Sequence, residues 1–165
     1  MTTVSMTATV LGLMTTDVPQ TCAFCEGDVI KNQVVYSGTD YQVLVDYAPI
    51  VEGHLLIVPK SHVATADELN PESGKELLET IKKVKKVFKS TLETDDYIIL
   101  QKNGKAAGQS VPHVHFHMIP IKSTGWRMLG QLKIFFKILF GSSPESKEAR
   151  VISQKKYREA FDKIS

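Results

Sequence analysis

The chain reads Val111-Pro112-His113-Val114-His115-Phe116-His117-Met118-Ile119 in the second half of its 165 residues. Three histidines alternate with apolar residues at a strict period of two, which is the spacing of one face of a β-strand. We therefore expect His113, His115 and His117 to point to one side, and the apolar residues between them to point into a core. Three imidazoles in a row are costly to bury unless each has a partner. The pattern indicates metal binding, or acid–base and nucleophilic chemistry near neutral pH.

The segment just before the histidines is small, polar and glycine-bearing, from Asn103 to Ser110. Such a segment can present backbone N–H groups and short side chains to an anion, as phosphate-binding loops do. It is neither a Walker A sequence nor a dinucleotide fingerprint. By itself it is a weak indication of phosphate binding.

Composition describes an ordinary globular chain, with 42% hydrophobic and 23% charged residues. The length fits one domain with a real core. The net charge of +2 is too small to indicate nucleic-acid binding by bulk electrostatics. The two cysteines, Cys22 and Cys25, form a C-x-x-C pair that is either a metal half-site or a redox pair. Tetrahedral zinc needs two more ligands, for which His62 and His113 are candidates.

The chain divides into three parts. Residues 1–20 contain a mild apolar patch without a preceding basic residue, which is a poor signal peptide and too short for a membrane span. We expect this part to be a flexible tail, residues 21–121 to be the main domain, and residues 122–165 to be a C-terminal extension. The expected location is the cytoplasm.

Periodicity predicts the elements of the main domain. Residues 34–36 and 41–45 read as two strands of a hairpin, and Leu55 to Val58 as a strand buried on both faces. Asn70 and Pro71 open a helix whose apolar residues recur at three to four positions as far as Leu92. Residues 97–101 form a further strand. These elements predict an α+β fold with an antiparallel sheet flanked by helices.

The sequence gives fewer structural signals in the C-terminal extension, residues 122–165. We expect a loop over residues 122–130 and a final amphipathic helix capped near Ser143 and running to about Ile164. The apolar segment 132–140 fits a core helix, a dimer contact or an interfacial membrane segment. A packing or oligomer role is favoured over membrane contact because the segment is short.

The stretch from Gly108 to His117 resembles the signature of the histidine triad (HIT) superfamily, His-x-His-x-His between apolar residues. Its Gly-Gln-Ser-Val lead-in is most similar to the Hint branch, the histidine triad nucleotide-binding proteins. The segment from Gly53 to His62 resembles a second family pattern, G-H-x-L-x-x-P-K-x-H. The resemblance implies a HIT-like sheet of about five strands and a homodimer.

The resemblance also implies roles for individual residues. His115 is the nucleophile, and His117 and His54 lie near the catalytic phosphate. Zinc-bearing relatives use two such cysteines with two histidines, which implies a structural zinc held by Cys22, Cys25, His62 and His113. Asp46, which follows a strand, contacts the ribose in this family; on sequence grounds a turn-forming aspartate fits equally well. The remaining expected substrate contacts are Asn103, Gly108, Gln109 and Ser110.

The function that fits is hydrolysis at the α-phosphate of a purine nucleotide conjugate, through a covalent nucleotidyl-histidine on His115. The other nitrogen of His115 must then carry a proton held by an acceptor such as a backbone carbonyl. Nucleoside phosphoramidates are the favoured substrates. A Fhit-like hydrolase of dinucleoside polyphosphates and a non-catalytic nucleotide-binding or scaffold protein are the alternatives.

Overall fold

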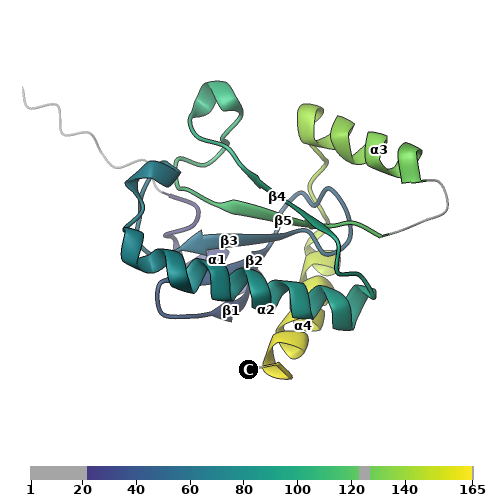
Figure 1. Cartoon of the computed structure of the whole chain (residues 1–165), viewed down its shortest axis with the longest axis horizontal. Coiled ribbons are helices and arrows are strands. Elements are labelled where there is room, and N and C mark those ends of the chain that lie inside the picture. The colour runs from purple at the N-terminus through teal and green to yellow at the C-terminus, as the bar shows by residue number, and fades with distance from the viewer. Residues whose placement is uncertain (1–21, 123–126, 165) are drawn as a thin grey trace, which may run out of the picture.

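In the computed structural model, which describes residues 22–122 and 127–164, five strands form one antiparallel sheet in the order β1-β2-β3-β5-β4 (Figure 1). The strands are β1 Val34–Ser37, β2 Tyr41–Val45, β3 Leu55–Pro59, β4 Tyr97–Gln101 and β5 Phe116–Pro120. The helices are α1 Gly27–Gln33, α2 Gly74–Leu92, α3 Arg127–Phe140 and α4 Lys147–Asp162. The predicted α+β fold class is confirmed. The expected N-terminal tail lies outside the described residues.

The β1–β2 hairpin lies where the sequence predicts it, and a side chain of α2 accepts hydrogen bonds from its turn. The backbone N–H of Asp40 donates to both carboxylate oxygens of Glu76, at 3.0 Å each, and the N–H of Tyr41 donates to one of them at 3.3 Å. A Cβ on Gly38 would collide with the same carboxylate. Glycine leaves room for this carboxylate beside the turn, and a larger residue would require the flexible Glu76 side chain to shift.

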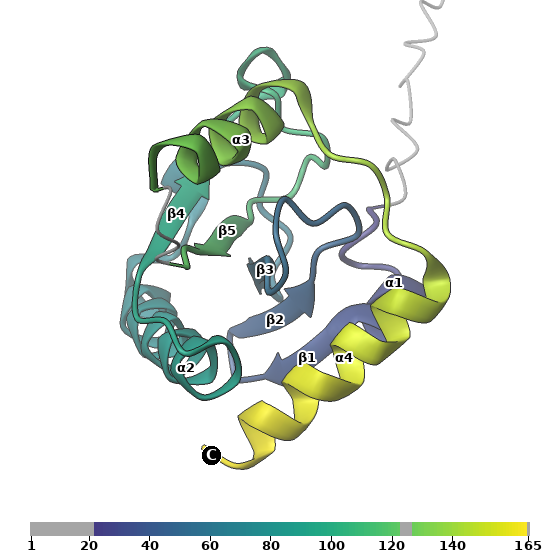
Figure 2. The ribbon, with the colours of Figure 1, turned by 90° about the vertical axis from the view of Figure 1, so that its right-hand side faces the viewer.

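Helix α2 begins as the sequence predicts. The Asn70 side chain accepts a hydrogen bond from the N–H of Glu72, and a 3₁₀ turn over Pro71–Ser73 leads into the α-helix. Its apolar residues Val84, Val87 and Phe88 are fully buried. With side chains of α4 they cover one face of the sheet, and Figure 2 shows α4 running beside β1.

The opposite face of the sheet carries the alternate residues of each strand, whose side chains point away from α2. Leu44, Leu56 and Val58 pack there against Cys22 and Phe24. In the antiparallel register Leu56 lies opposite His117. Because residues directly opposite each other share a face, His117 lies on the side of the sheet away from α2.

The three-histidine stretch is not one continuous strand. Strand β5 begins at Phe116, so that His113 and His115 precede it in irregular backbone. Val114 and Met118 are buried as expected. The prediction that all three imidazoles line one strand face is wrong, because the chain before Phe116 leaves the ladder and carries His113 to a separate cluster.

The extension differs from its prediction at two boundaries. Helix α3 begins at Arg127, within the expected loop, whose Trp126 lies outside the described residues. The cap of α4 is Ser146, whose hydroxyl accepts from the N–H of Ala149, and not Ser143. Ser146 is the cap because its backbone is extended, which is the non-helical conformation that the position before the first turn requires.

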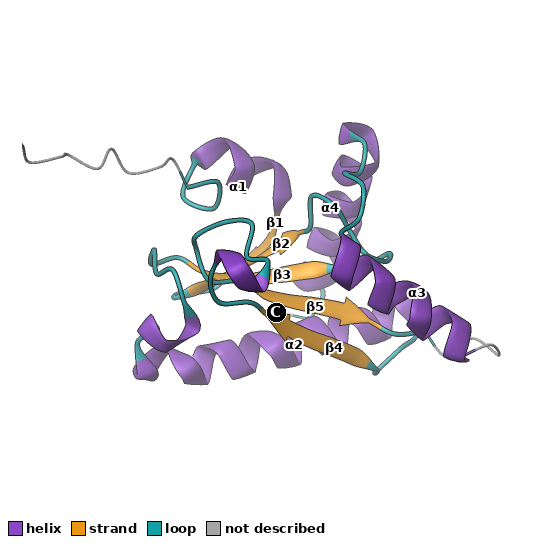
Figure 3. Ribbon diagram, turned by 90° about the horizontal axis from the view of Figure 1, so that it is seen from above, coloured by secondary structure: helices purple, strands orange, loops and turns teal. Residues whose placement is uncertain are grey.

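Helix α3 lies on the face of the sheet opposite α2 (Figures 1 and 3). Its large apolar side chains are about half exposed or more, which excludes the core-helix interpretation for them: Leu132, Phe135, Phe136, Leu139 and Phe140. None of the described helices has the length and hydropathy needed to cross a bilayer.

Candidate active site and metal centre

A pocket of about 320 Å³ opens on the sheet face that carries His117. It collects side chains from four parts of the chain: the end of β2, the loop before β3, the β4–β5 segment and the C-terminal part of α3. The residues expected from sequence that line it are Asp46, His54, Gly108, Ser110, His115 and His117. The fold therefore brings six of the predicted catalytic and substrate-binding residues together.

The central imidazole, His115, is held in one orientation. Its Nδ1 lies 2.8 Å from the carbonyl oxygen of His113, to which it donates. In the neutral ring the lone pair is then on Nε2. Burial lowers the pKa of His115, although the bond to the His113 carbonyl opposes this shift. His115 is therefore a neutral imidazole at neutral pH, with its proton on Nδ1.

His54 and His117 form a hydrogen-bonded pair beside it. The backbone N–H of Ile50 donates to His54 Nδ1 at 3.1 Å, which assigns the proton of the neutral ring to Nε2. That nitrogen lies 2.9 Å from His117 Nδ1. Burial lowers the pKa of His54 to about 4. His54 therefore donates to His117, whose Nε2 then carries the proton of that ring.

Asp46 has two separate sets of contacts. Its Oδ1 accepts from the N–H of Ala48 at 2.7 Å, which is the turn contact expected of an aspartate at this place. Its Oδ2 lies 3.5 Å from His54 Nε2 and 3.6 Å from His117 Nδ1. Burial raises the pKa of Asp46, but the facing imidazoles of His117 and His54 and the N–H of Ala48 outweigh it and lower the pKa overall. Asp46 is therefore a carboxylate facing the two histidines.

The loop before the histidines contributes less than the sequence suggests. Gly108, at φ +82°, and Ser110 line the pocket. The Asn103 amide oxygen instead accepts from the N–H of Ala66 at 3.0 Å. The Gln109 side chain bridges the N–H of Gly104 and the carbonyl of Ala64. The structure does not bring the Asn103 and Gln109 side chains to the pocket; they fasten the loop to its neighbours.

Several pocket residues are not indicated by any sequence pattern. Lys102 lies directly before the expected phosphate loop, while Lys137, Ile138, Gly141 and Ser142 come from α3 and the segment after it. The Lys137 ammonium donates to the carbonyl of Ile50 at 2.8 Å, and the Ser142 hydroxyl donates to that of Ala48. No local signal could have found the four residues of the extension, because their approach depends on how the extension folds back; Lys102 could have been noted from its place next to the glycine-bearing loop.

A second cluster joins the two cysteines to two histidines. Cys22 Sγ lies 3.4 Å and Cys25 Sγ 3.6 Å from His113 Nδ1, and Cys25 Sγ lies 3.4 Å from His62 Nδ1. The four ligand atoms all lie within 4.8 Å of one another. Tetrahedral zinc, with Zn–S of about 2.3 Å and Zn–N of about 2.05 Å, holds sulfur and nitrogen ligands about 3.6 Å apart. The cluster therefore fits tetrahedral zinc.

The orientation of His113 supports the same fit. Its Nε2 lies 2.9 Å from the Pro59 carbonyl, to which it donates, so that Nδ1 keeps the lone pair that faces the thiols. The Phe24 ring packs edge-on against His113 and His115, at centroid distances of 5.8 and 5.3 Å. The C-x-x-C turn thus contacts both the cysteine–histidine cluster and the pocket residue His115.

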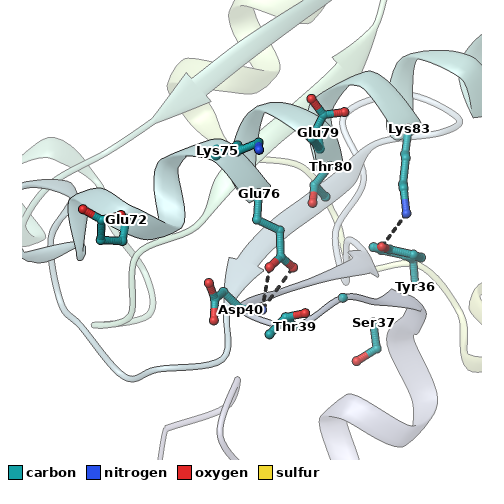
Figure 4. A pocket seen from close by; sticks show the side chains of 11 residues that line it. Tyr36, Ser37, Thr39, Asp40, Glu72, Lys75, Glu76, Glu79, Thr80 and Lys83 are labelled. Atoms are coloured by element: carbon teal, nitrogen blue, oxygen red, sulfur yellow. Dashed lines mark hydrogen bonds between the residues drawn. The ribbon is translucent and has the colours of Figure 1, made fainter.

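A larger hollow of about 620 Å³ lies between the β1–β2 hairpin and α2 (Figure 4). Its lining contains no histidine, and two of its charged groups are held by neutral polar groups: Glu76 accepts from the Asp40 backbone N–H, and Lys83 donates to the Tyr36 hydroxyl at 2.7 Å. It offers none of the chemistry that the histidine pocket offers.

Comparison with known proteins agrees with this geometry. The HIT domain family model matches residues 28–124. The adenosine 5′-monophosphoramidase HNT1 of Candida albicans is 38% identical over 108 residues, which cover 61% of this chain and 70% of the relative. The asymmetrical bis(5′-nucleosyl)-tetraphosphatase of Schizosaccharomyces pombe is 33% identical over 93 residues, 56% of this chain and 51% of the relative.

A solved structure of similar fold is the zinc-bound histidine triad family protein of Mycobacterium smegmatis. It is 22% identical, with a TM-score of 0.65 over 87% of this chain and 95% of that chain. The family model covers more than half of the sequence, and the phosphoramidase relative is matched over more than two thirds of its length. The chain belongs to the HIT domain family.

Proposed function

We propose that this protein hydrolyses nucleotide conjugates at the α-phosphate, with His115 as the nucleophile. The observation that carries the proposal is the bond from His115 Nδ1 to the His113 carbonyl inside the pocket. It leaves Nε2 with a lone pair, as nucleophilic attack on phosphorus requires. The similarity to an adenosine 5′-monophosphoramidase supports the same reaction class.

The reaction runs in two displacements. His115 Nε2 attacks the α-phosphorus, a P–N bond forms, and the bond from phosphorus to the leaving group breaks. A water molecule then attacks the same phosphorus and breaks the P–N bond, which releases the mononucleotide and restores His115. The two steps replace one difficult hydrolysis.

His117 and His54 act as a unit in this scheme. With the proton of His54 directed to His117 Nδ1, His117 presents an Nε2–H that can donate to a phosphoryl oxygen or to the departing atom. Such general acid–base help is typically worth roughly 10²–10⁴-fold. The Gly108 backbone and the Ser110 hydroxyl bind the phosphate, and Asp46 binds the ribose. Asn103 and Gln109 support the loop that presents them.

Structural zinc belongs to the proposal. Cys22, Cys25, His62 and His113 would hold the ion, and four protein ligands leave no position for a reacting water. When bound, zinc ties together the C-x-x-C turn and the start of the histidine stretch. Reduced cysteine ligands agree with a cytoplasmic location.

A homodimer is also part of the proposal. Strand β4 ends the sheet, and among the described residues no element pairs with its outer edge. Its residues Ile98 and Ile99 are 39% and 43% exposed, which is unusual for a finished edge. Light scattering at micromolar concentration tests this: a monomeric mass would contradict it.

Phosphoramidates are the first substrate class, and dinucleoside polyphosphates the second. The similarity to a phosphoramidase favours the first class, and the similarity to a tetraphosphatase is the reason for retaining the second. A non-catalytic nucleotide-binding role is the third possibility. The complete set of His54, His115 and His117 in one pocket argues against it.

The test is steady-state hydrolysis of adenosine 5′-phosphoramidate beside diadenosine tri- and tetraphosphate. We expect the phosphoramidate to be cleaved fastest, and His115→Ala to lose at least about 10⁴-fold in kcat/KM while binding AMP within a few-fold. If a dinucleoside polyphosphate is cleaved fastest, the nucleophile stands and the substrate class is wrong. If the zinc-loaded protein binds AMP and cleaves nothing, the enzyme proposal fails.

A further inference from the structure

The pocket contains a cation whose position no internal contact explains. Lys102 is half-buried, and its ammonium lies over Gly108: a Cβ built on that glycine would be 3.4 Å from Lys102 Nζ. In the described part of the chain, no carboxylate, carbonyl or hydroxyl accepts a hydrogen bond from this ammonium. A half-buried lysine lays its stem along the protein and keeps its ammonium at the open side, which here is the pocket.

The sheet register explains how Lys102 reaches the histidines. Leu100 lies opposite His117, and Gln101 opposite Phe116, in the β4–β5 ladder. Lys102 follows β4 directly and has the parity of Leu100, so that it lies on the same face as His117. Leu100, Lys102, His115 and His117 all line the pocket. Lys102, one residue after β4, therefore lines the same pocket as His115, one residue before β5.

The remaining charges of the pocket leave this cation unbalanced. Asp46 is the carboxylate among the described lining residues, and it faces His54 and His117. Lys137 adds a second cation, but its ammonium is held by the Ile50 carbonyl. The wall that carries Lys102 is therefore positive and lacks a counter-charge.

We propose that Lys102 forms an anion subsite beside His115 that binds a negatively charged leaving group, a carboxylate or a phosphate close to the scissile bond. This proposal rests on the proposed function and adds the substrate class to it. The α-phosphate itself has Ser110, the Gly108 backbone and the histidines as partners. A further full positive charge next to them selects conjugates that carry a further negative charge.

The alternative explanation of Lys102 is packing, since its Cδ lies 3.7 Å from the position that a Cβ on Gly108 would take. A packing role depends on the aliphatic stem, whereas the subsite depends on the charge. Lys102→Gln keeps much of the stem and removes the charge, and Lys102→Arg keeps the charge. Lys105, three residues along the same loop, is exposed and outside the pocket, so that Lys105→Gln is a matched control.

The experiment compares three adenylyl substrates that differ in the leaving group: tryptamine, which lacks an acidic group, an α-amino acid joined through its nitrogen, and ADP in diadenosine triphosphate. We expect Lys102→Gln to lower kcat/KM about 10- to 100-fold for the carboxylate or the phosphate leaving group and to change the tryptamine substrate by less than about threefold. Lys102→Arg should recover most of the loss, and Lys105→Gln should match the parent protein.

The two anionic arms identify the source of the charge. A loss confined to the amino-acid substrate assigns the subsite to a carboxylate, and a loss confined to diadenosine triphosphate assigns it to a phosphate. An equal loss on all three substrates would place Lys102 at the shared nucleotidyl group and overturn the proposal. No loss on any of them would overturn it as well.

A binding arm keeps the result independent of turnover. ADP and AMP differ by one phosphate, so calorimetry on the parent protein and on Lys102→Gln reports the subsite directly. We expect the variant to lose the extra affinity for ADP and to keep its affinity for AMP. If that selective loss occurs while no substrate is cleaved, the proposed function has failed and the anion subsite has not.

Discussion

At the scale of single residues, the pocket depends on where each imidazole proton is held. Backbone groups decide this for two rings: the His113 carbonyl accepts from His115, and the Ile50 N–H donates to His54. Both rings are buried, and burial lowers the pKa of each. The proposed nucleophile is therefore ready at neutral pH without a neighbouring carboxylate to deprotonate it.

Burial of His54 makes the stability of the fold depend on pH. Its pKa of about 4 in the folded state lies below the ordinary value of 6.5, so the unfolded chain binds the proton more tightly. Stability is therefore complete above pH 6.5 and falls as the pH drops toward 4. Between pH 7 and pH 5 we expect this residue to cost about 2 kcal/mol.

Urea unfolding at the two pH values measures this loss. His54→Gln keeps a hydrogen-bond acceptor near Ile50 but cannot take up a proton. Its free energy of unfolding should fall about 2 kcal/mol less than that of the parent protein over the same range. Equal losses in the two proteins would show that His54 is not the group responsible.

At the scale of elements, one carboxylate of α2 organises the β1–β2 turn. Glu76 accepts from the N–H groups of Asp40 and Tyr41, which Glu76→Ala would leave without that partner. We expect this change to lower the free energy of unfolding by about 1–3 kcal/mol. Glu79→Ala, which removes a solvent-exposed pair with Lys82, should leave the stability nearly unchanged, because solvent screens such a pair.

Chemical denaturation of the two variants under one set of conditions makes the comparison. If Glu76→Ala and Glu79→Ala unfold at the same urea concentration, the turn does not depend on the carboxylate.

The same elements mark what the sequence can predict. The hairpin, β3, β4 and α2 follow from apolar periodicity and turn or cap residues, which act over a few positions. The start of β5 could not be predicted in this way. The alternation of apolar and polar residues continues back through His115 and His113, whereas the hydrogen-bonded strand begins only at Phe116. The hydrogen bonds of the Asn103 and Gln109 side chains could not be predicted either, because their partners Ala66 and Ala64 are distant in sequence.

At the scale of the whole molecule, the pocket is completed by the extension. Lys137 and Ser142 reach across to the carbonyls of Ile50 and Ala48. Sequence patterns predicted the pocket histidines well, because two short motifs hold them. They could not predict this closure, which arises from the return of α3 over the sheet face opposite α2 (Figure 3).

The cysteine–histidine cluster connects three segments that are distant in sequence: the C-x-x-C turn, the loop after β3 and the histidine stretch. We expect the purified protein to contain one zinc per chain. Cys22→Ser should reduce that content and lower Tm by roughly 6–12 °C, equivalent to about 3 kcal/mol. Ser61→Ala, an exposed change beside His62, should leave both unchanged.

Elemental analysis and thermal scans with and without a chelator give the two readouts. A structural zinc would be contradicted if the Cys22→Ser protein had full zinc content, or if the chelator left the Tm of the parent protein unchanged.

His113 serves the two centres with different atoms. Its ring faces the cysteines and its carbonyl oxygen holds the proton of His115. For protein design this means that the proposed nucleophile cannot be transferred to another protein as a single side chain. A transplanted His115 needs a neighbouring residue whose backbone is fixed by other contacts, and here those contacts come from the cluster of Cys22, Cys25 and His62. A graft of the His-x-His-x-His segment alone would carry the imidazoles and lose the anchor, whereas a graft that includes the C-x-x-C turn and His62 would bring the proton acceptor in its working position.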